Sequence, residues 1–144
     1  MRLSKYTRIS LPTESYLNLL GIAISVFSSN FTFLIENIIR NDNQDLYNWH
    51  ALIDENKMSR IYDAINKTIT PIQDDSIVEI FKEIIVRRNR IIHSFRVTSE
   101  NKEQILATKN PKNQIQYEID EEYLIDFINL NNKMSKKLHD LRGF

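Results

Sequence analysis

Apolar residues recur every three or four positions over long stretches of the chain, a spacing typical of amphipathic α-helices. The longest stretch predicts a first helix over residues 13–40, with a broad apolar face. A second helix is predicted over residues 54–69. Between them the helical pattern breaks, and residues 46–52 predict a surface loop or short helix that Trp49, the single tryptophan, anchors.

The third helix carries an apolar stripe that runs to Phe95, and we expect this helix to end near Val97. Its start has two alternatives, because Thr70 and Ser76 each stand three residues before a glutamine or glutamate, as in a capping box. A fourth helix is predicted over residues 120–142. Acidic residues occupy its first turn and basic residues its last turn, as the helix dipole favours.

Two short segments between the third and fourth helices have extended character. They cover residues 105–108 and 114–119, and a turn-forming sequence rich in asparagine, with one proline, lies between them. The sequence therefore predicts an all-α fold, an up-and-down four-helix bundle with a small β-hairpin inserted before the last helix. We expect residues 1–144 to form a single domain of this kind.

Composition narrows the classes of function. The 144 residues include 19 basic and 19 acidic side chains, so any contact with nucleic acid must come from a local patch of charge. The absence of cysteine excludes thiolate metal sites, and the presence of only 2 glycines disfavours a glycine-rich phosphate loop. The apolar run over residues 16–27 is too short and too polar to cross a bilayer, so we expect a cytoplasmic protein without membrane contact.

The candidate chemistry lies in the third helix. Arg88 occupies a stripe position where an apolar residue is expected, so its guanidinium needs a partner, a second subunit or an anion-filled cleft. Asn89 and His93 are four residues apart, a spacing at which helical side chains can touch. Residues 84–99 contain four arginines and one histidine but no acid. Since arginine binds phosphate as a planar fork and histidine transfers protons near neutral pH, this pattern favours a phosphodiester substrate.

The segment Arg88-Asn89-Arg90-Ile91-Ile92-His93 resembles the Arg-x4-6-His motif of HEPN-domain ribonucleases, in the form in which an asparagine follows the arginine. That family is built on a helical bundle, and its motif lies towards the end of the third core helix. The resemblance implies that two protomers pair so that their motifs share one cleft, where single-stranded RNA is cut without a metal or cofactor. It also implies three catalytic roles: His93 would transfer a proton at a ribose oxygen, Arg88 would hold the scissile phosphate, and Asn89 would orient one of them.

The resemblance further implies that the protein acts as a toxin or as a phage-defence effector, with an antitoxin or another defence-system protein as a partner. We expect Arg87, Arg90 and Arg96 to bind RNA beside the catalytic residues. Some members of the family carry a tyrosine two residues after the histidine, where a partner nucleotidyltransferase modifies it. Phe95 occupies that position here, which excludes this form of control.

Two other interpretations stay open on the sequence. A HEPN-like helical module without catalysis would use the same residues to bind RNA, a nucleotide or a partner protein. A plain helical bundle would instead hold Arg88 in a structural ion pair, with Glu36 or Glu83 as the acid, and would leave His93 as a surface group.

Overall fold

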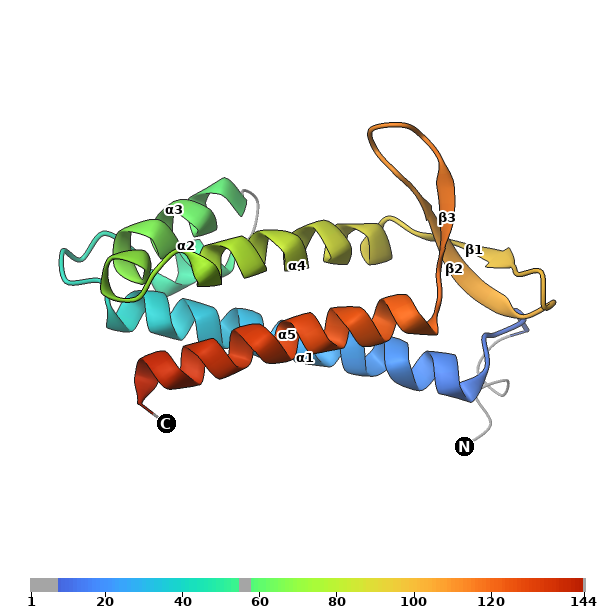
Figure 1. Ribbon diagram of the computed structural model, residues 1–144, viewed down its shortest axis with the longest axis horizontal. Coiled ribbons are helices and arrows are strands. Elements are labelled where there is room, and N and C mark those ends of the chain that lie inside the picture. Colours follow the sequence, from blue (N-terminus) through green and yellow to red (C-terminus); the bar gives the residue numbers. More distant parts are fainter. Residues whose placement is uncertain (1–7, 55–57, 144) are drawn as a thin grey trace.

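Figure 1 shows the protein as a computed structural model, in which residues 8–54 and 58–143 are described. Helices dominate these residues, and a small antiparallel sheet stands at one end of them (Figure 1). The elements follow one another in the order α1 (Glu14–Arg40), α2 (Trp49–Ile53), α3 (Met58–Thr68), the 3₁₀ turn η2 (Thr70–Ile72), α4 (Ser76–Ile92), β1 (Phe95–Thr98), β2 (Gln104–Lys109), β3 (Gln116–Ile119) and α5 (Glu121–Arg142).

The two longest helices, α1 and α5, lie side by side and run in the same direction (Figure 1). Near their starts, the Ser15 hydroxyl donates to the Glu121 carboxylate at 2.8 Å. Near their middles, the Asn30 amide donates to the Asn131 carbonyl oxygen at 2.6 Å. The first and last long helices are therefore parallel, whereas an up-and-down bundle of four helices would make them antiparallel.

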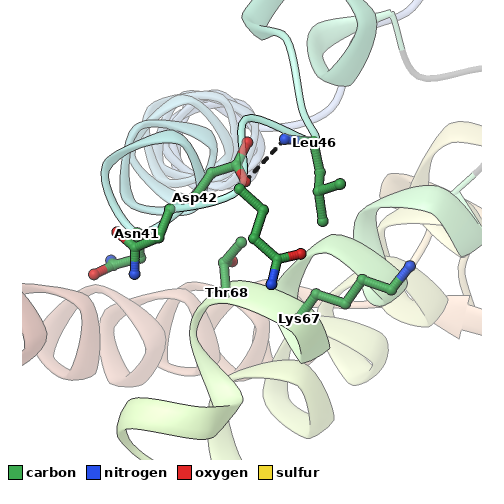
Figure 2. A pocket seen from close by; sticks show the side chains of 7 residues that line it. Asn41, Asp42, Leu46, Lys67 and Thr68 are labelled. Atoms are coloured by element: carbon green, nitrogen blue, oxygen red, sulfur yellow. Dashed lines mark hydrogen bonds between the residues drawn. The ribbon is translucent and has the colours of Figure 1, made fainter.

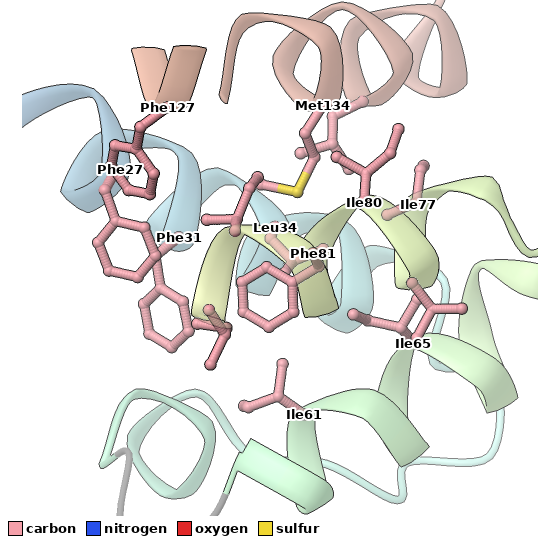
Figure 3. Close-up of a cluster of buried hydrophobic side chains, with 14 of the residues drawn as sticks. Phe27, Phe31, Leu34, Ile61, Ile65, Ile77, Ile80, Phe81, Phe127 and Met134 are labelled. Carbon is pink, nitrogen blue, oxygen red and sulfur yellow. The ribbon is translucent and has the colours of Figure 1, made fainter. Parts of the chain in front are cut away.

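The core lies between α1, α3, α4 and α5 (Figure 3). A row of aromatic rings runs through it: the ring centres of Phe27 and Phe31 are 6.0 Å apart, and those of Phe31 and Phe81 are 6.1 Å apart. Phe127 of α5 continues the row at 6.4 Å from Phe27. Aromatic pairs at this spacing add to the free energy gained from burial, so the row ties three helices together.

By length and composition, α1 is the one helix within the described ranges that is apolar enough to cross a bilayer. Core helices of soluble proteins meet the same criterion. In this protein α1 supplies fully buried residues to the core, among them Ala23, Leu34 and Ile38.

The predicted all-α fold class is wrong, because the chain also contains a three-stranded antiparallel sheet in the order β1-β2-β3. The predicted hairpin is present as β2 and β3, in which Thr108 pairs with Tyr117. The unpredicted strand is β1, which pairs with β2 so that Phe95 lies opposite Ala107. The third helix therefore ends at Ile92 and not near Val97. The helical spacing of Phe95 was overridden, because pairing with β2 satisfies the backbone groups of this segment.

The other predicted boundaries differ less. The first and last helices are confirmed: Thr13 caps α1, Asp120 caps α5, and Gly143 ends α5 with a left-handed backbone, φ 85°. Of the two alternative starts for the third helix, Ser76 is the first residue of α4, and the turn after Thr70 is separate. In the predicted second helix, position 54 belongs to the end of α2, and residues 55–57 lie outside the described residues.

The hydroxyl of Tyr16 joins α1 to the sheet. It donates a hydrogen bond to the carbonyl oxygen of Ile119 at 2.6 Å and accepts one from the backbone N–H of Leu106 at 3.1 Å. The Tyr16 side chain is buried, so no water can replace it easily. One side chain on α1 thus satisfies backbone groups on both β2 and β3.

We predict that Tyr16→Phe lowers the free energy of unfolding by about 1–3 kcal/mol, because it leaves a buried carbonyl and a partly buried N–H without this partner. Urea denaturation measures the change. Tyr62→Phe is the matched control, since the Tyr62 hydroxyl forms no hydrogen bond within the described ranges. Equal stability of the two variants would contradict the bridging role of Tyr16.

Candidate functional site

Arg88 lies on the core side of α4, between the buried residues Ile84 and Ile91 of the predicted stripe. The central carbon of its guanidinium is 5.2 Å from the centre of the Phe27 ring on α1. Its Nη2 donates to the Asn89 side-chain oxygen at 3.1 Å. Since a cation over an aromatic face is stabilised, the stripe position of Arg88 has an explanation within one chain. The stripe position of Arg88 therefore does not by itself argue for a second subunit.

The charge of Arg88 also affects the Tyr62 hydroxyl on α3. Burial raises the pKa of the Tyr62 hydroxyl, and the nearby Arg88 guanidinium opposes that rise. The two acids considered as its partners are engaged by other arginines. Glu83 pairs with Arg87 at 2.9 Å, and Glu36 pairs with Arg142 at 3.7 Å.

His93 is the residue that follows the last turn of α4. Its backbone N–H donates to the Asn89 carbonyl oxygen at 2.9 Å, and its carbonyl oxygen accepts from the Thr108 hydroxyl at 3.5 Å. The His93 side chain is exposed, and its ring forms no hydrogen bond or ion pair with any residue in the described ranges. The structure therefore does not join the ring to Asn89 or Arg88, although all three residues stand at the same end of one helix.

The order of side chains around α4 shows what surrounds His93. At about 100° per residue, Asn89 and His93 lie between Ile92 and Val86 around the end of the helix. One turn before Asn89, the same arc holds the buried Ile85. Ile92 is 54% exposed and Val86 is 59% exposed. A polar strip that contains the candidate histidine is thus bordered on both sides by exposed apolar side chains.

The three arginines expected to bind RNA each donate a hydrogen bond to another residue of the chain. The Arg87 Nε donates to Glu83 at 2.9 Å, and the Arg90 Nη1 donates to the carbonyl oxygen of Lys109 at 3.0 Å. A guanidinium nitrogen of Arg96 donates to the carbonyl oxygen of Ser10. A guanidinium group has five N–H donors, so each of these contacts positions the arginine and leaves donors for a phosphate.

Two tyrosines near this end of α4 were not recognised in the sequence. The hydroxyl of Tyr123 donates to the Arg87 carbonyl oxygen at 3.1 Å, and the Arg87 guanidinium carbon is 5.6 Å from the centre of the Tyr123 ring. The ring of Tyr117 is 6.4 Å from that of Tyr123. Burial, and then the neighbouring Tyr117, raise the pKa of Tyr123 strongly, while Arg87 and Arg90 oppose the rise. No local pattern could have revealed this contact, because it depends on how the sheet and α5 pack on α4.

A cavity of about 450 Å³ lies at the opposite end of the helices, where α1 gives way to the loop that follows it (Figure 2). The Asp42 carboxylate there accepts from the backbone N–H groups of Leu46 and Tyr47, at 3.0 Å and 2.7 Å. Lys67, also in its lining, pairs with Asp63 at 3.1 Å. These contacts hold the loop in place and engage Asp42 and Lys67, the charged side chains that line the cavity. The cavity therefore offers no second candidate site for catalysis.

Across residues 8–54 and 58–143, no three histidine, aspartate or glutamate side chains lie close enough together to hold a metal ion. Comparison of the chain with protein-family models, curated proteins and solved structures found no match. The interpretation of the site therefore rests on its own residues and their geometry.

Proposed function

We propose that the protein is a metal-independent endoribonuclease that cleaves single-stranded RNA. One observation carries the proposal: His93 stands in solvent at the end of α4, with the Arg88–Asn89 pair on one side of the helix and Arg90 on the other. A histidine in contact with water, on a helix end that also carries fixed cations, suits attack on a phosphodiester. Action as a toxin or a phage-defence effector is the biological role that accords with this chemistry.

In this mechanism the neutral imidazole of His93 takes the proton of a ribose 2′-hydroxyl. The 2′-oxygen then bonds to the adjacent phosphorus, the bond to the 5′-oxygen breaks, and that oxygen takes a proton from water. The protonated His93 returns its proton to water. The products are a 2′,3′-cyclic phosphate and a 5′-hydroxyl. Negative charge grows on the phosphorus oxygens during the attack, and the Arg88 guanidinium, oriented by Asn89, would stabilise it.

A homodimer completes the proposed site. Ile92 and Val86 border the strip that holds His93, and exposed apolar side chains at such positions favour contact with another surface. A two-fold axis near this strip would bring the same residues of both copies together, since such interfaces are self-complementary. The two His93 side chains would then face one shared cleft, which the RNA enters.

A binding module without catalysis is the second candidate. It is favoured by the His93 ring, which no hydrogen bond orients within the described ranges, whereas a general base is commonly held by a third group. Such contacts often form only when substrate binds, so the free protein is compatible with both candidates.

Replacing His93 distinguishes the two candidates. We predict that His93→Ala lowers the free energy of unfolding by no more than about 1 kcal/mol, because the side chain is exposed. Cleavage of a fluorescent single-stranded RNA should fall about 100-fold or more, because the proton acceptor is lost. His50→Ala is the matched control, since His50 is also exposed but lies on α2. A His93 variant that melts and cuts as the wild type does would leave the binding module as the better account.

Cleavage should persist in the presence of EDTA, because proton transfer by His93 and charge stabilisation by arginine need no metal ion. The assay compares initial rates with and without the chelator at constant ionic strength. If cutting stopped in EDTA and returned with magnesium, the proposed mechanism would be wrong.

Light scattering at micromolar concentration should show a dimer. Ile92→Lys should make it monomeric and abolish cutting, because a charge replaces an apolar side chain at the expected interface. Ile72→Lys is the control, since Ile72 is 58% exposed and lies in η2, at the other end of α4. A monomeric wild type that still cuts RNA would contradict the shared cleft.

A further inference from the structure

Two rings and one planar cation pack together beside the end of α4. The ring centres of Tyr117 and Tyr123 are 6.4 Å apart, with an angle of 42° between the rings. The Arg87 guanidinium carbon is 5.6 Å from the centre of the Tyr123 ring. We call Arg87, Tyr117 and Tyr123 the tyrosine platform. It joins α4 to β3 and α5, which follow one another in the sequence and lie far from α4 along the chain.

The sheet places this platform close to His93. Thr108 is the cross-strand partner of Tyr117, and its hydroxyl donates to the carbonyl oxygen of His93 at 3.5 Å. The next residue, Lys109, accepts from the Arg90 guanidinium at 3.0 Å. Tyr117 therefore lies at the same junction of helix and sheet as the candidate catalytic histidine, and Arg90 belongs to that junction too.

The inner part of the platform is fixed by structural contacts. The Tyr123 hydroxyl donates to the Arg87 carbonyl oxygen at 3.1 Å, and its strongly raised pKa keeps it in the neutral, donating form. Arg87 is also held by Glu83. Tyr117 is only partly buried, so part of its side chain stays in contact with solvent.

Cationic groups extend this surface beyond the platform. The hairpin between β2 and β3 projects from the body of the protein next to the end of α4 (Figure 1). It carries Lys109 and Lys112, both exposed, at its base and near its tip. An aromatic ring with cations around it is the arrangement that binds single-stranded nucleic acid, in which bases stack on rings and phosphates contact the cations.

We infer that Tyr117 stacks on a base next to the scissile phosphate of single-stranded RNA, while Arg90 contacts the RNA backbone beside it. The inference rests on the proposed function, because it takes the RNA to lie at His93. It assigns to the hairpin the task of holding the substrate, and to the platform the preference for strands whose bases are unpaired. Paired bases would present no free face to Tyr117.

The test measures binding without cleavage. The probe is a short fluorescent oligouridylate whose 2′-oxygens are methylated, so that His93 cannot start the reaction. A second probe has the same sugar–phosphate backbone without bases. We expect the wild type to bind the first probe about 10-fold more tightly than the second, a ratio in the range measured for stacking on one aromatic ring.

Tyr117→Leu should abolish this preference and bind both probes equally, because leucine keeps an apolar side chain against Tyr123 but has no aromatic face. Tyr117→Phe should restore the preference. Gln116→Leu is the matched control, because Gln116 is exposed and points to the other face of the same strand. The salt dependence of binding should be unchanged in all three variants, since no charge is altered.

The outcomes separate this inference from the proposed function. A Tyr117→Leu variant that keeps the preference, or a wild type that has none, overturns the role of Tyr117, even if unmodified RNA is cut. A wild type with a Tyr117-dependent preference that fails to cut unmodified RNA supports base stacking on Tyr117 and overturns the nuclease proposal.

Discussion

The pairing of β1 with β2 is the constraint on which the arrangement of this protein depends. It uses backbone N–H and C=O groups that would otherwise continue α4, so the helix ends at Ile92 and the chain turns at His93. The Tyr16 hydroxyl ties β2 and β3 to α1, so the sheet is anchored to the long helices as well. The exposed histidine and the projecting hairpin both follow from this one junction.

The same junction explains the direction of the last helix. After the hairpin, β3 leads directly into α5, which begins at the sheet and runs back along α1 (Figure 1). Buried contacts such as Asn30 with Asn131 then fix the register of the two parallel helices. In an up-and-down bundle of four helices the third helix is parallel to the first, which makes the fourth antiparallel to it. Here α4 runs opposite to α1, so the single reversal at the sheet leaves α5 parallel to α1 (Figure 1).

Arg88 shows how a cation is accommodated in an apolar stripe when its side chain is neither fully exposed nor fully buried. Its guanidinium is placed over Phe27, and Asn89 accepts one of its N–H groups. The Arg88 side chain is half-buried, and its Nε lies below the surface. The arrangement suits a structural role and a phosphate-binding role equally, so the case for catalysis depends on His93 and not on Arg88.

Local patterns in the sequence were sufficient to predict α1, α5 and the β2–β3 hairpin. Helical spacing, the caps Thr13 and Asp120, and the turn residues between the strands depend only on near neighbours in the chain. The motif from Arg88 to His93 was visible for the same reason. The motif identified candidate residues, but it did not show which of them are in contact.

Tertiary structure alone decided the rest. Phe95 continues the helical spacing of α4, and only its distant partner Ala107 turns it into a strand residue. Tyr117 and Tyr123 carry no local signal. Tyr123 contacts Arg87, and Tyr117 contacts Tyr123, because the sheet and α5 fold back onto α4. Strand pairing and packing join residues that are far apart in the chain, whereas helical spacing, caps and turns record only the preferences of neighbours. The sequence by itself therefore determined which candidate side chains the protein carries. The pairing of β1 with β2 determined that His93 is exposed at the end of α4.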